Sequence, residues 1–463
     1  MKAWVLVAAL GVALSGFTTI KESDAQSTLI APPPAVLTIP SSFREQAFPS
    51  PWRIRKIEWT KADEAGFGEF IRAIAQSGCT TTISCMQSAA NFYHDTDPPS
   101  FYFHADCAKW VYMLRAYYAS RNGLPFSYVS HIAGDGDDFR FSKASNLALA
   151  RTDIVDSGWG IDTVAVLQRL HDEVWTATYR MDPSTQIPLP QDFYSPKIQP
   201  GSIRAGTAIY DINGHVAIVY EVTADGSILY MDAHPGEAVT RGAFGVHIPK
   251  SPIWLGGGFK NFRPLKLEGA QLQPDGTYVG GHIVLAPNEA IADFSLEQYR
   301  GNAPDAKGDD PNTLFRYNNV SLDLYEFARA SMSNGSFAFN PVYELKVTMG
   351  SLCRDASDRT REAKARVKNG LATLHADLAK MAALWEQRDL RVVYHGSSLK
   401  QTLAETYAAQ ERACMIANSS NATSAAISPL EQFVRRAPEA DIRRLIAQID
   451  DAAPFAGMRP VGY

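Results

Sequence analysis

The most informative stretch of the sequence is residues 202–234, which read SIRAGTAIYDINGHVAIVYEVTADGSILYMDAH. It predicts a β-meander, because runs of β-branched and aromatic residues are separated by turn residues. Two strands are expected, at 215–222 (HVAIVYEV) and 227–232 (SILYMD). Asp225-Gly226 lies between them and is a hairpin signal, because tight turns need the positive φ that glycine adopts easily. The stretch therefore predicts paired antiparallel strands.

Strand pairing predicts which polar side chains of this hairpin share a face. With a two-residue turn, Ala217 lies opposite His234. With a four-residue loop, His215 lies opposite His234, and Ala217 lies opposite Asp232. Cross-strand neighbours share a face, so both registers put Asp232 and His234 on the His215 face. An odd shift or a bulge would turn them to the other face.

Segments before the meander predict helices and further strands. Residues 107–120 (CAKWVYMLRAYYAS) carry apolar side chains at helical spacing, and Asp106 stands at the N-cap position. Residues 60–77 carry an apolar stripe, with Thr60 at the N-cap position and acidic residues in the first turn. A further helix is expected over 156–180, whereas 123–143 indicate a strand, a Gly/Asp loop and a second strand. This combination predicts an α+β fold.

The composition is that of a folded globular protein. Of the 463 residues, 46% are hydrophobic and 20% are charged, which excludes a disordered chain, a coiled-coil rod and a collagen. The 49 acidic and 44 basic residues give a net charge of −5. Proteins that bind nucleic acids normally present a basic face. We therefore expect no nucleic-acid partner.

The N-terminus indicates export. Residues 1–25 (MKAWVLVAALGVALSGFTTIKESDA) combine a lysine, an apolar run and small residues before a cleavage position. This is the pattern of a secretory signal peptide, and the alternative is an uncleaved anchor helix. Residues 26–55 are rich in proline and serine and predict an extended linker. No other stretch approaches 18 apolar residues. We therefore expect no integral membrane span after signal cleavage, and a secreted or periplasmic protein.

Two domains are expected after the linker. Residues 56–265 hold the helices and strands described above and predict an α+β domain. Residues 266–463 change in character and predict a mostly helical domain. Within it, residues 355–388 and 398–418 are rich in Ala, Leu, Lys, Glu and Arg, which is typical of long helices. We expect these two helices to form a hairpin over 355–418.

The five cysteines differ in their expected partners. Cys79 and Cys85 lie six residues apart beside a helix end and predict a local disulfide. Cys353 precedes the first helix of the predicted hairpin and Cys414 lies near the end of the second, so antiparallel helices would bring them together. Both pairs are disulfide candidates in an oxidising compartment. They leave Cys107 as the free thiol.

Cys107 is the candidate nucleophile because it opens a predicted helix. Backbone N–H groups and the helix dipole favour an anion at that position, and therefore a thiolate. A thiol nucleophile needs a base within hydrogen-bonding reach, and the base needs an orienting group. His215, at the start of an apolar strand, is the candidate base, although it could also be only a polar residue at a strand edge. Asp232 is the candidate orienting group, and His234 is the alternative.

These elements resemble the papain-like thiol hydrolases of the NlpC/P60 type, with echoes of transglutaminase-like proteins. Residues 106–108 (DCA) resemble the Asp-Cys-Ser/Ala that opens the nucleophile helix of that family. Residues 214–219 (GHVAIV) resemble its His-Val-Gly-Ile strand, and 231–234 (MDAH) resemble the strand that follows. The resemblance covers about residues 100–235. The sequence departs from the family where Ala-Lys-Trp follows the cysteine in place of Ser-Gly-Phe.

The resemblance implies a papain-like domain in which the nucleophile helix packs on an antiparallel sheet. It implies a thioester mechanism on an amide, with Cys107 as nucleophile, His215 as general base and acid, and Asp232 as orienting group. The backbone N–H of Cys107 would contribute to the oxyanion hole. Tyr102 and His104 are candidates for substrate or oxyanion contacts. In a bacterial periplasm, the implied substrate is a peptidoglycan peptide.

Three functions are compatible with the sequence. The first is a secreted or periplasmic cysteine peptidase or amidase that acts on cell-wall peptides. The second is a transglutaminase-like acyl transferase or deamidase, which would use the same thiol. The third is a binding or scaffold protein on an inactive papain-like fold. None of the three calls for a cofactor, and no metal is expected, because the histidines lack spacing such as His-Glu-x-x-His. The oligomeric state is open.

Overall fold

The computed structural model contains helices and antiparallel sheets, which confirms the predicted α+β class. It describes residues 48, 50–245, 248, 250–303, 314–317 and 320–333. All of them belong to one unit of the chain. The predicted signal peptide at 1–25, most of the predicted linker, the helical hairpin at 355–418, Cys353 and Cys414 lie outside the described residues.

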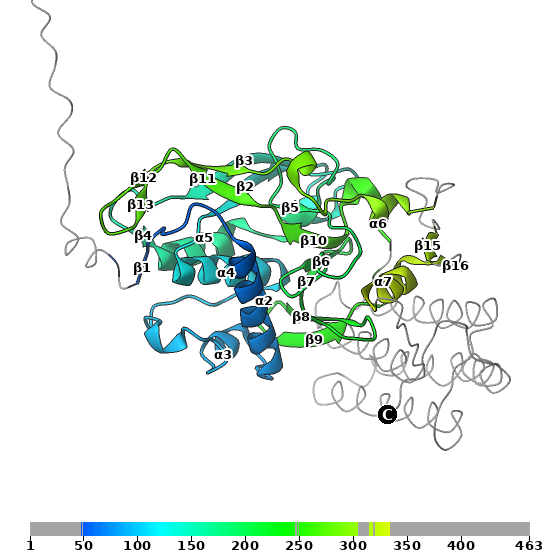
Figure 1. The fold of residues 1–463 in the computed structure, drawn as a ribbon, viewed down its shortest axis with the longest axis horizontal. Coiled ribbons are helices and arrows are strands. Elements are labelled where there is room, and N and C mark those ends of the chain that lie inside the picture. Colours follow the sequence, from blue (N-terminus) through cyan, green and yellow to red (C-terminus); the bar gives the residue numbers. More distant parts are fainter. Residues whose placement is uncertain are drawn as a thin grey trace, which may run out of the picture. The chain divides into compact units, whose positions relative to one another are not determined.

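A six-stranded antiparallel sheet lies at the centre of the described residues (Figure 1). In spatial order, its strands are β5 (Phe193–Tyr194), β10 (Gly258–Phe262), β6 (Ala208–Asp211), β7 (His215–Val222), β8 (Ile228–Ala233) and β9 (Val239–Ala243). β6, β7 and β8 are neighbours both in the chain and in the sheet, so the meander predicted over 202–234 is confirmed. β9 extends it by one strand.

Two helices cover one face of this sheet (Figure 1). α4 (Cys107–Asn122) packs on β7 and β8, and α2 (Lys61–Gln76) packs on β7 and on α4. Both helices begin as their sequences predict, because Asp106 caps α4 and Thr60 caps α2. Gly123, with a φ of 63°, ends α4 in the left-handed conformation that glycine tolerates. α4 is buried on almost all sides and forms the centre of the largest core cluster.

A third helix covers part of the opposite face. The segments involved are α7 (Leu324–Met332) and the hairpin of β15 (Phe315–Tyr317) and β16 (Val320–Leu322). Apolar side chains of α7 join a second core cluster that includes Ala217 and Tyr230 of the sheet. Arg329 of α7 pairs with Asp225 in the β7–β8 turn at 3.2 Å. α7 therefore reaches the turn end of β7, whereas His215 lies at the other end of that strand.

Smaller elements flank the main sheet. They are β1 (Pro51–Trp52), α3 (Thr82–Met86), β2 (Phe126–Ala133), β3 (Leu147–Ile154), β4 (Ile161–Asp162), α5 (Thr163–Glu173), β11 (Leu265–Glu268), β12 (Gln271–Leu272), β13 (Tyr278–Val279), β14 (His282–Leu285) and α6 (Glu297–Arg300). β2 pairs with β3, which begins later than the second strand expected within 123–143 because a 3-10 turn at Phe139–Phe141 intervenes. α5 begins later than the helix expected over 156–180. The Asp156 carboxylate accepts hydrogen bonds from the backbone N–H groups of Gly158 and Gly160 and so holds these residues in a loop.

Residues on both sides of the predicted 56–265 domain belong to its hydrophobic core. Trp52 and Ile54, within the segment predicted to be a linker, are buried in the same cluster as α4. Leu267 and Ile283, beyond the predicted end of the domain, also join that cluster. Composition does not predict where this core begins and ends along the chain, because the burial of individual apolar side chains decides which residues pack together.

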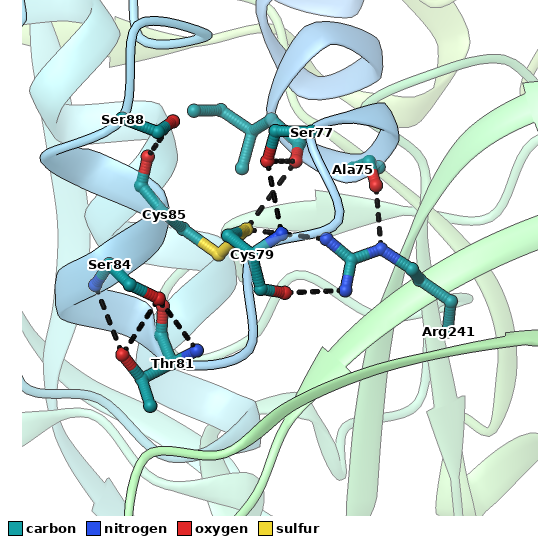
Figure 2. Close-up of a disulfide and its surroundings, with 9 residues drawn as sticks. Ala75, Ser77, Cys79, Thr81, Ser84, Cys85, Ser88 and Arg241 are labelled. Carbon is teal, nitrogen blue, oxygen red and sulfur yellow. Dashed lines mark hydrogen bonds between the residues drawn. A yellow bond between two sulfur atoms is a disulfide. The ribbon is translucent and has the colours of Figure 1, made fainter.

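The predicted disulfide between Cys79 and Cys85 is confirmed (Figure 2). Arg241 of β9 ties its loop to the sheet, since the guanidinium donates to the backbone oxygens of Ala75 and Cys79, each at 2.6 Å. The backbone N–H of Val239 also donates to this loop, at 2.8 Å. The disulfide loop therefore supports β9, which in turn pairs with β8.

Removing this disulfide by the double substitution Cys79→Ser and Cys85→Ser should lower the free energy of unfolding by about 2 kcal/mol. The crosslink closes a short loop and restricts the unfolded chain, which is the main source of its stabilisation. Urea unfolding followed by circular dichroism measures the effect. As a control, a reductant should destabilise the wild type and leave the double variant unchanged. Equal stability of the oxidised wild type and the variant would contradict the prediction.

Candidate active site

Two irregularities set the register of the β7–β8 hairpin. Val222 pairs with Ile228, which leaves a five-residue loop, one residue longer than the four-residue alternative. By itself this odd shift would turn the polar side chains of β8 to the other face. Tyr220 is then skipped in a bulge, and beyond it Ile218 pairs with Met231. The bulge cancels the shift, so the register at the start of β7 is the one expected for a four-residue loop.

This register brings His215, Asp232 and His234 together. The Nε2 atom of His215 lies 2.8 Å from Oδ2 of Asp232, whose side chain is buried. The rings of His215 and His234 stack with centroids 5.4 Å apart. Thr240 of β9 donates its hydroxyl to Oδ1 of Asp232 and lies 3.0 Å from Nε2 of His234. The Asp232 carboxylate is therefore held from one side by Thr240 and bound to His215 on the other.

Cys107 is the first residue of α4 and is a free, buried cysteine. Asp106 before it accepts the backbone N–H of Lys109 at 3.2 Å, and its carboxylate pairs with the Lys109 ammonium at 2.5 Å. The charge of Asp106 is thus compensated within the first turn. Tyr179 donates its hydroxyl to the backbone oxygen of Ala108 at 2.8 Å and secures the same turn.

Cys107 and His215 meet at the end of the sheet. Val216 and Ile218 of β7 belong to the core cluster on the α4 side, whereas Ala217 belongs to the cluster on the α7 side. Strand alternation therefore assigns His215 to the α7 side. His215 is the first residue of its strand, and its side chain lies close enough to Cys107 for negative charge there to raise the pKa of the imidazole. The contact is thus made around the strand end and not through the packed face of the sheet.

The charges of the site reinforce one another. Burial alone would lower the pKa of His215, but negative charge at Cys107 and Asp232 and hydrogen bonds to both raise that pKa well above its ordinary value. Burial alone would raise the pKa of Asp232, but His215, His234 and the Thr240 hydroxyl hold it well below its ordinary value. The site therefore favours an imidazolium next to a carboxylate, and such an imidazolium stabilises negative charge on a neighbouring sulfur.

Tyr102 and His104, the predicted substrate or oxyanion contacts, lie beside the turn that follows β8. Nδ1 of His104 is hydrogen-bonded to the carboxylate of Glu237 in that turn. The ring of Tyr102 lies 4.6 Å from the His104 ring and 5.2 Å from the ring of His171 in α5. Glu237 has a φ of 73°, which is uncommon for residues other than glycine. The proposed roles of Tyr102 and His104 stay predictions.

Two residues that support this site, Thr240 and Tyr179, could not be recognised from the sequence. Thr240 lies in a short strand, VTRGA, whose glycine and arginine conceal the alternation that usually signals a strand. The only hint was that a buried carboxylate needs more than one hydrogen-bond donor. Tyr179 lies in a 3-10 turn far from Cys107 in the sequence, and no local pattern connects the two.

Among the residues that the structure describes, no group of three or more His, Cys, Asp or Glu side chains is placed to hold a metal ion. Within the same residues, no helix combines the length and the apolar character needed to span a membrane.

Comparison with protein-family models, with curated proteins and with solved structures finds no match for this chain.

Proposed function

We propose that the protein is a cysteine amidohydrolase or peptidase, with Cys107 as nucleophile, His215 as general base and acid, and Asp232 as orienting group. The observation that carries this proposal is the His215 ring, hydrogen-bonded to the buried Asp232 carboxylate and close enough to Cys107 for negative charge there to raise its pKa. A nucleophile, a base hydrogen-bonded to it and a group that orients the base are the parts that thiol catalysis requires.

The proposed reaction proceeds through a thioester. The Cys107 sulfur attacks the carbonyl carbon of an amide, and the carbonyl oxygen becomes an oxyanion. The oxyanion accepts a hydrogen bond from the backbone N–H of Cys107, which has no acceptor within the helix. The C–N bond then breaks, and the His215 imidazolium gives its proton to the leaving amine. Water attacks the thioester while His215 takes up a proton, which releases the carboxylic acid and frees the Cys107 sulfur for the next cycle.

The hydrogen bond to Asp232 selects the nitrogen of His215 that takes part in this chemistry. Since Nε2 is bound to the Asp232 carboxylate, Nδ1 is the ring nitrogen left to exchange protons with Cys107 and the substrate. Thr240 holds the carboxylate and so limits its rotation. This arrangement supports a fixed ring orientation throughout both half-reactions.

The proposal includes a fold type, a compartment and a substrate class. A helix that begins at the nucleophile and packs on an antiparallel sheet, with base and orienting group on successive strands, supports a papain-like domain of the NlpC/P60 type. The signal-peptide pattern at 1–25 and the Cys79–Cys85 disulfide support a secreted or periplasmic location. In a bacterial periplasm, the substrate class is a peptidoglycan peptide.

Alkylation of the native protein by iodoacetamide tests the proposal. We expect Cys107 to react at pH 6 at least about tenfold faster than N-acetylcysteine, because a catalytic cysteine is activated by the base beside it. The raised pKa of His215 keeps its imidazolium present at this pH and above it. Mass spectrometry of proteolytic peptides identifies the modified cysteine.

The same reaction in urea is the control, because unfolding separates Cys107 from His215 and should abolish the rate advantage. A native Cys107 that reacts no faster than the model thiol would contradict the proposal and favour a non-catalytic binding or scaffold protein. Release of ammonia from a glutamine peptide, without a new amine terminus, would select the acyl transferase or deamidase instead.

A further inference from the structure

Glu237 connects three segments around the proposed active site. It lies in the turn between β8 and β9, where its backbone N–H donates to the backbone oxygen of His234 at 2.8 Å. Its own backbone oxygen accepts the N–H of Thr82, the first residue of α3, at 3.0 Å. Its carboxylate is hydrogen-bonded to Nδ1 of His104. Glu237 therefore joins this turn both to α3 and to the segment that precedes Cys107.

The backbone conformation of Glu237 favours glycine over glutamate. Its φ of 73° lies in the left-handed region, where a Cβ atom is crowded. The side chains of His104 and Glu237 are 39% and 30% exposed, and a polar contact between two such side chains contributes little to stability. Stability therefore does not explain a glutamate at this position. Strain that the surrounding contacts hold in place points to a functional role.

The contacts of Glu237 form a short path from the nucleophile to the base. His104 lies three residues before Cys107 in the chain, and a stretch of that length spans at most about 11 Å. The residues between them belong to no helix or strand. At the other end of the path, the ring of His234 stacks on that of His215 with centroids 5.4 Å apart. The bond to Glu237 thus anchors an irregular segment directly before the nucleophile.

We propose that Glu237 is a positioning residue, which holds the His104 segment so that the Cys107 sulfur stays within reach of His215. This inference rests on the proposed function and adds to it a residue that acts through His104 and does not touch the substrate. A displacement of about 1 Å between reacting groups can cost about 10²-fold in rate, so a single anchor of this segment is enough to affect catalysis.

Glu237→Gly tests this role, because it removes the carboxylate and also relieves the backbone. We expect kcat for hydrolysis of the cyanomethyl ester of N-acetylalanine to fall at least about tenfold, with little change in KM. The urea concentration at the midpoint of unfolding should stay the same or rise, because glycine adopts a φ of 73° without strain. The rate of Cys107 alkylation by iodoacetamide should fall as well.

Glu237→Gln is the conservative variant. Its amide oxygen can still accept a hydrogen bond from His104, so it should keep most of the wild-type kcat. Asp95→Gly is the matched control, because the Asp95 carboxylate lies 3.0 Å from Nε2 of His94 in another partly exposed pair. The neighbouring Tyr93 accepts a hydrogen bond from Asn122, at the opposite end of α4 from Cys107. Asp95→Gly should therefore keep the wild-type kcat.

A double-mutant cycle tests whether Glu237 acts through His104. His104→Ala should lower kcat about as much as Glu237→Gly, and the double variant should lose no more than either single variant, because all three lack the same contact. Losses that add in the double variant would show that the two residues act separately and would overturn the inference.

The remaining outcomes separate this inference from the proposed function. An unchanged kcat in Glu237→Gly overturns the positioning role, and so does a loss of kcat that comes with a lower midpoint of unfolding. If Cys107 is activated in the wild type and equally reactive in Glu237→Gly, the positioning role fails and the proposed function stands. If wild type and Cys107→Ala consume the ester equally, the proposed function fails and the inference fails with it.

Discussion

The Cys107→Ala variant is expected to hydrolyse a cell-wall peptide at least about 10³-fold more slowly than the wild type. The substitution removes the atom that forms the C–S bond in the proposed mechanism, and His215 and Asp232 cannot replace it. Because Cys107 is buried and alanine is only slightly smaller, the cost in the free energy of unfolding should be about 1 kcal/mol. A fluorogenic amine reagent measures new amine termini, and urea unfolding measures stability.

Cys107→Ser is the matched variant, because it keeps the size of the side chain and exchanges the thiol for a hydroxyl that ionises far less readily. It should also be inactive while it retains the wild-type circular dichroism spectrum. Activity that survives in the alanine variant would place the nucleophile elsewhere and would reject the proposed mechanism.

The Asp232→Asn variant is expected to lose about 10²- to 10⁴-fold in kcat, with a smaller change in KM. Asparagine has nearly the same shape, so the strand pairing of β8 with β9 should persist. The amide cannot stabilise an imidazolium as the carboxylate does, and it permits the wrong tautomer of His215. Steady-state kinetics on the same peptide measures both constants.

The stability of this variant should also depend differently on pH. The pKa of Asp232 is lowered on folding. Its contribution to the free energy of unfolding is therefore complete above about pH 4 and is lost as the pH falls. The pKa of His215 is raised on folding. Its contribution to the free energy of unfolding is therefore complete below about pH 6.5 and is lost as the pH rises through the pKa of His215 in the folded protein. The difference in unfolding free energy between wild type and Asp232→Asn should therefore be largest between about pH 4 and pH 6.5.

Asp225→Asn is the matched control for these measurements. Asp225 lies in the turn of the same hairpin and pairs with Arg329, at the opposite end of β7 from His215. Its substitution should leave kcat unchanged and cost some stability. Equal losses of kcat in the two variants would show that Asp232 acts only through general destabilisation of the hairpin.

Local patterns predicted much of the framework correctly. Asp106 and Thr60 cap α4 and α2 where the sequence indicates, because a side chain that caps a helix acts on backbone groups two or three residues away. The β7–β8 strands and the Cys79–Cys85 disulfide also depend on neighbours close in the chain. Such features can be predicted from a short window of residues.

The limits of the domain could not be predicted in this way. Trp52 and Leu267 are buried in the same core although one lies in a proline-rich segment and the other follows a change in composition. Thr240 and Tyr179 support the site from segments that carry no local signal. Their importance arises from contacts between residues that are distant in the chain.

The β7–β8 hairpin separates what the sequence predicts from what the tertiary structure decides. The sequence by itself determined that β7 and β8 pair and that His215, Asp232 and His234 lie near their ends. Only the tertiary structure decided that they share a face, because a five-residue loop and a bulge at Tyr220 cancel each other. It also decided that Cys107 meets His215 around the strand end, since the packing of α4 on β7 and β8 sets where the helix begins relative to the sheet. The physical reason is that strand parity changes with a single residue, and packing across the whole sheet selects the register that buries the apolar rows.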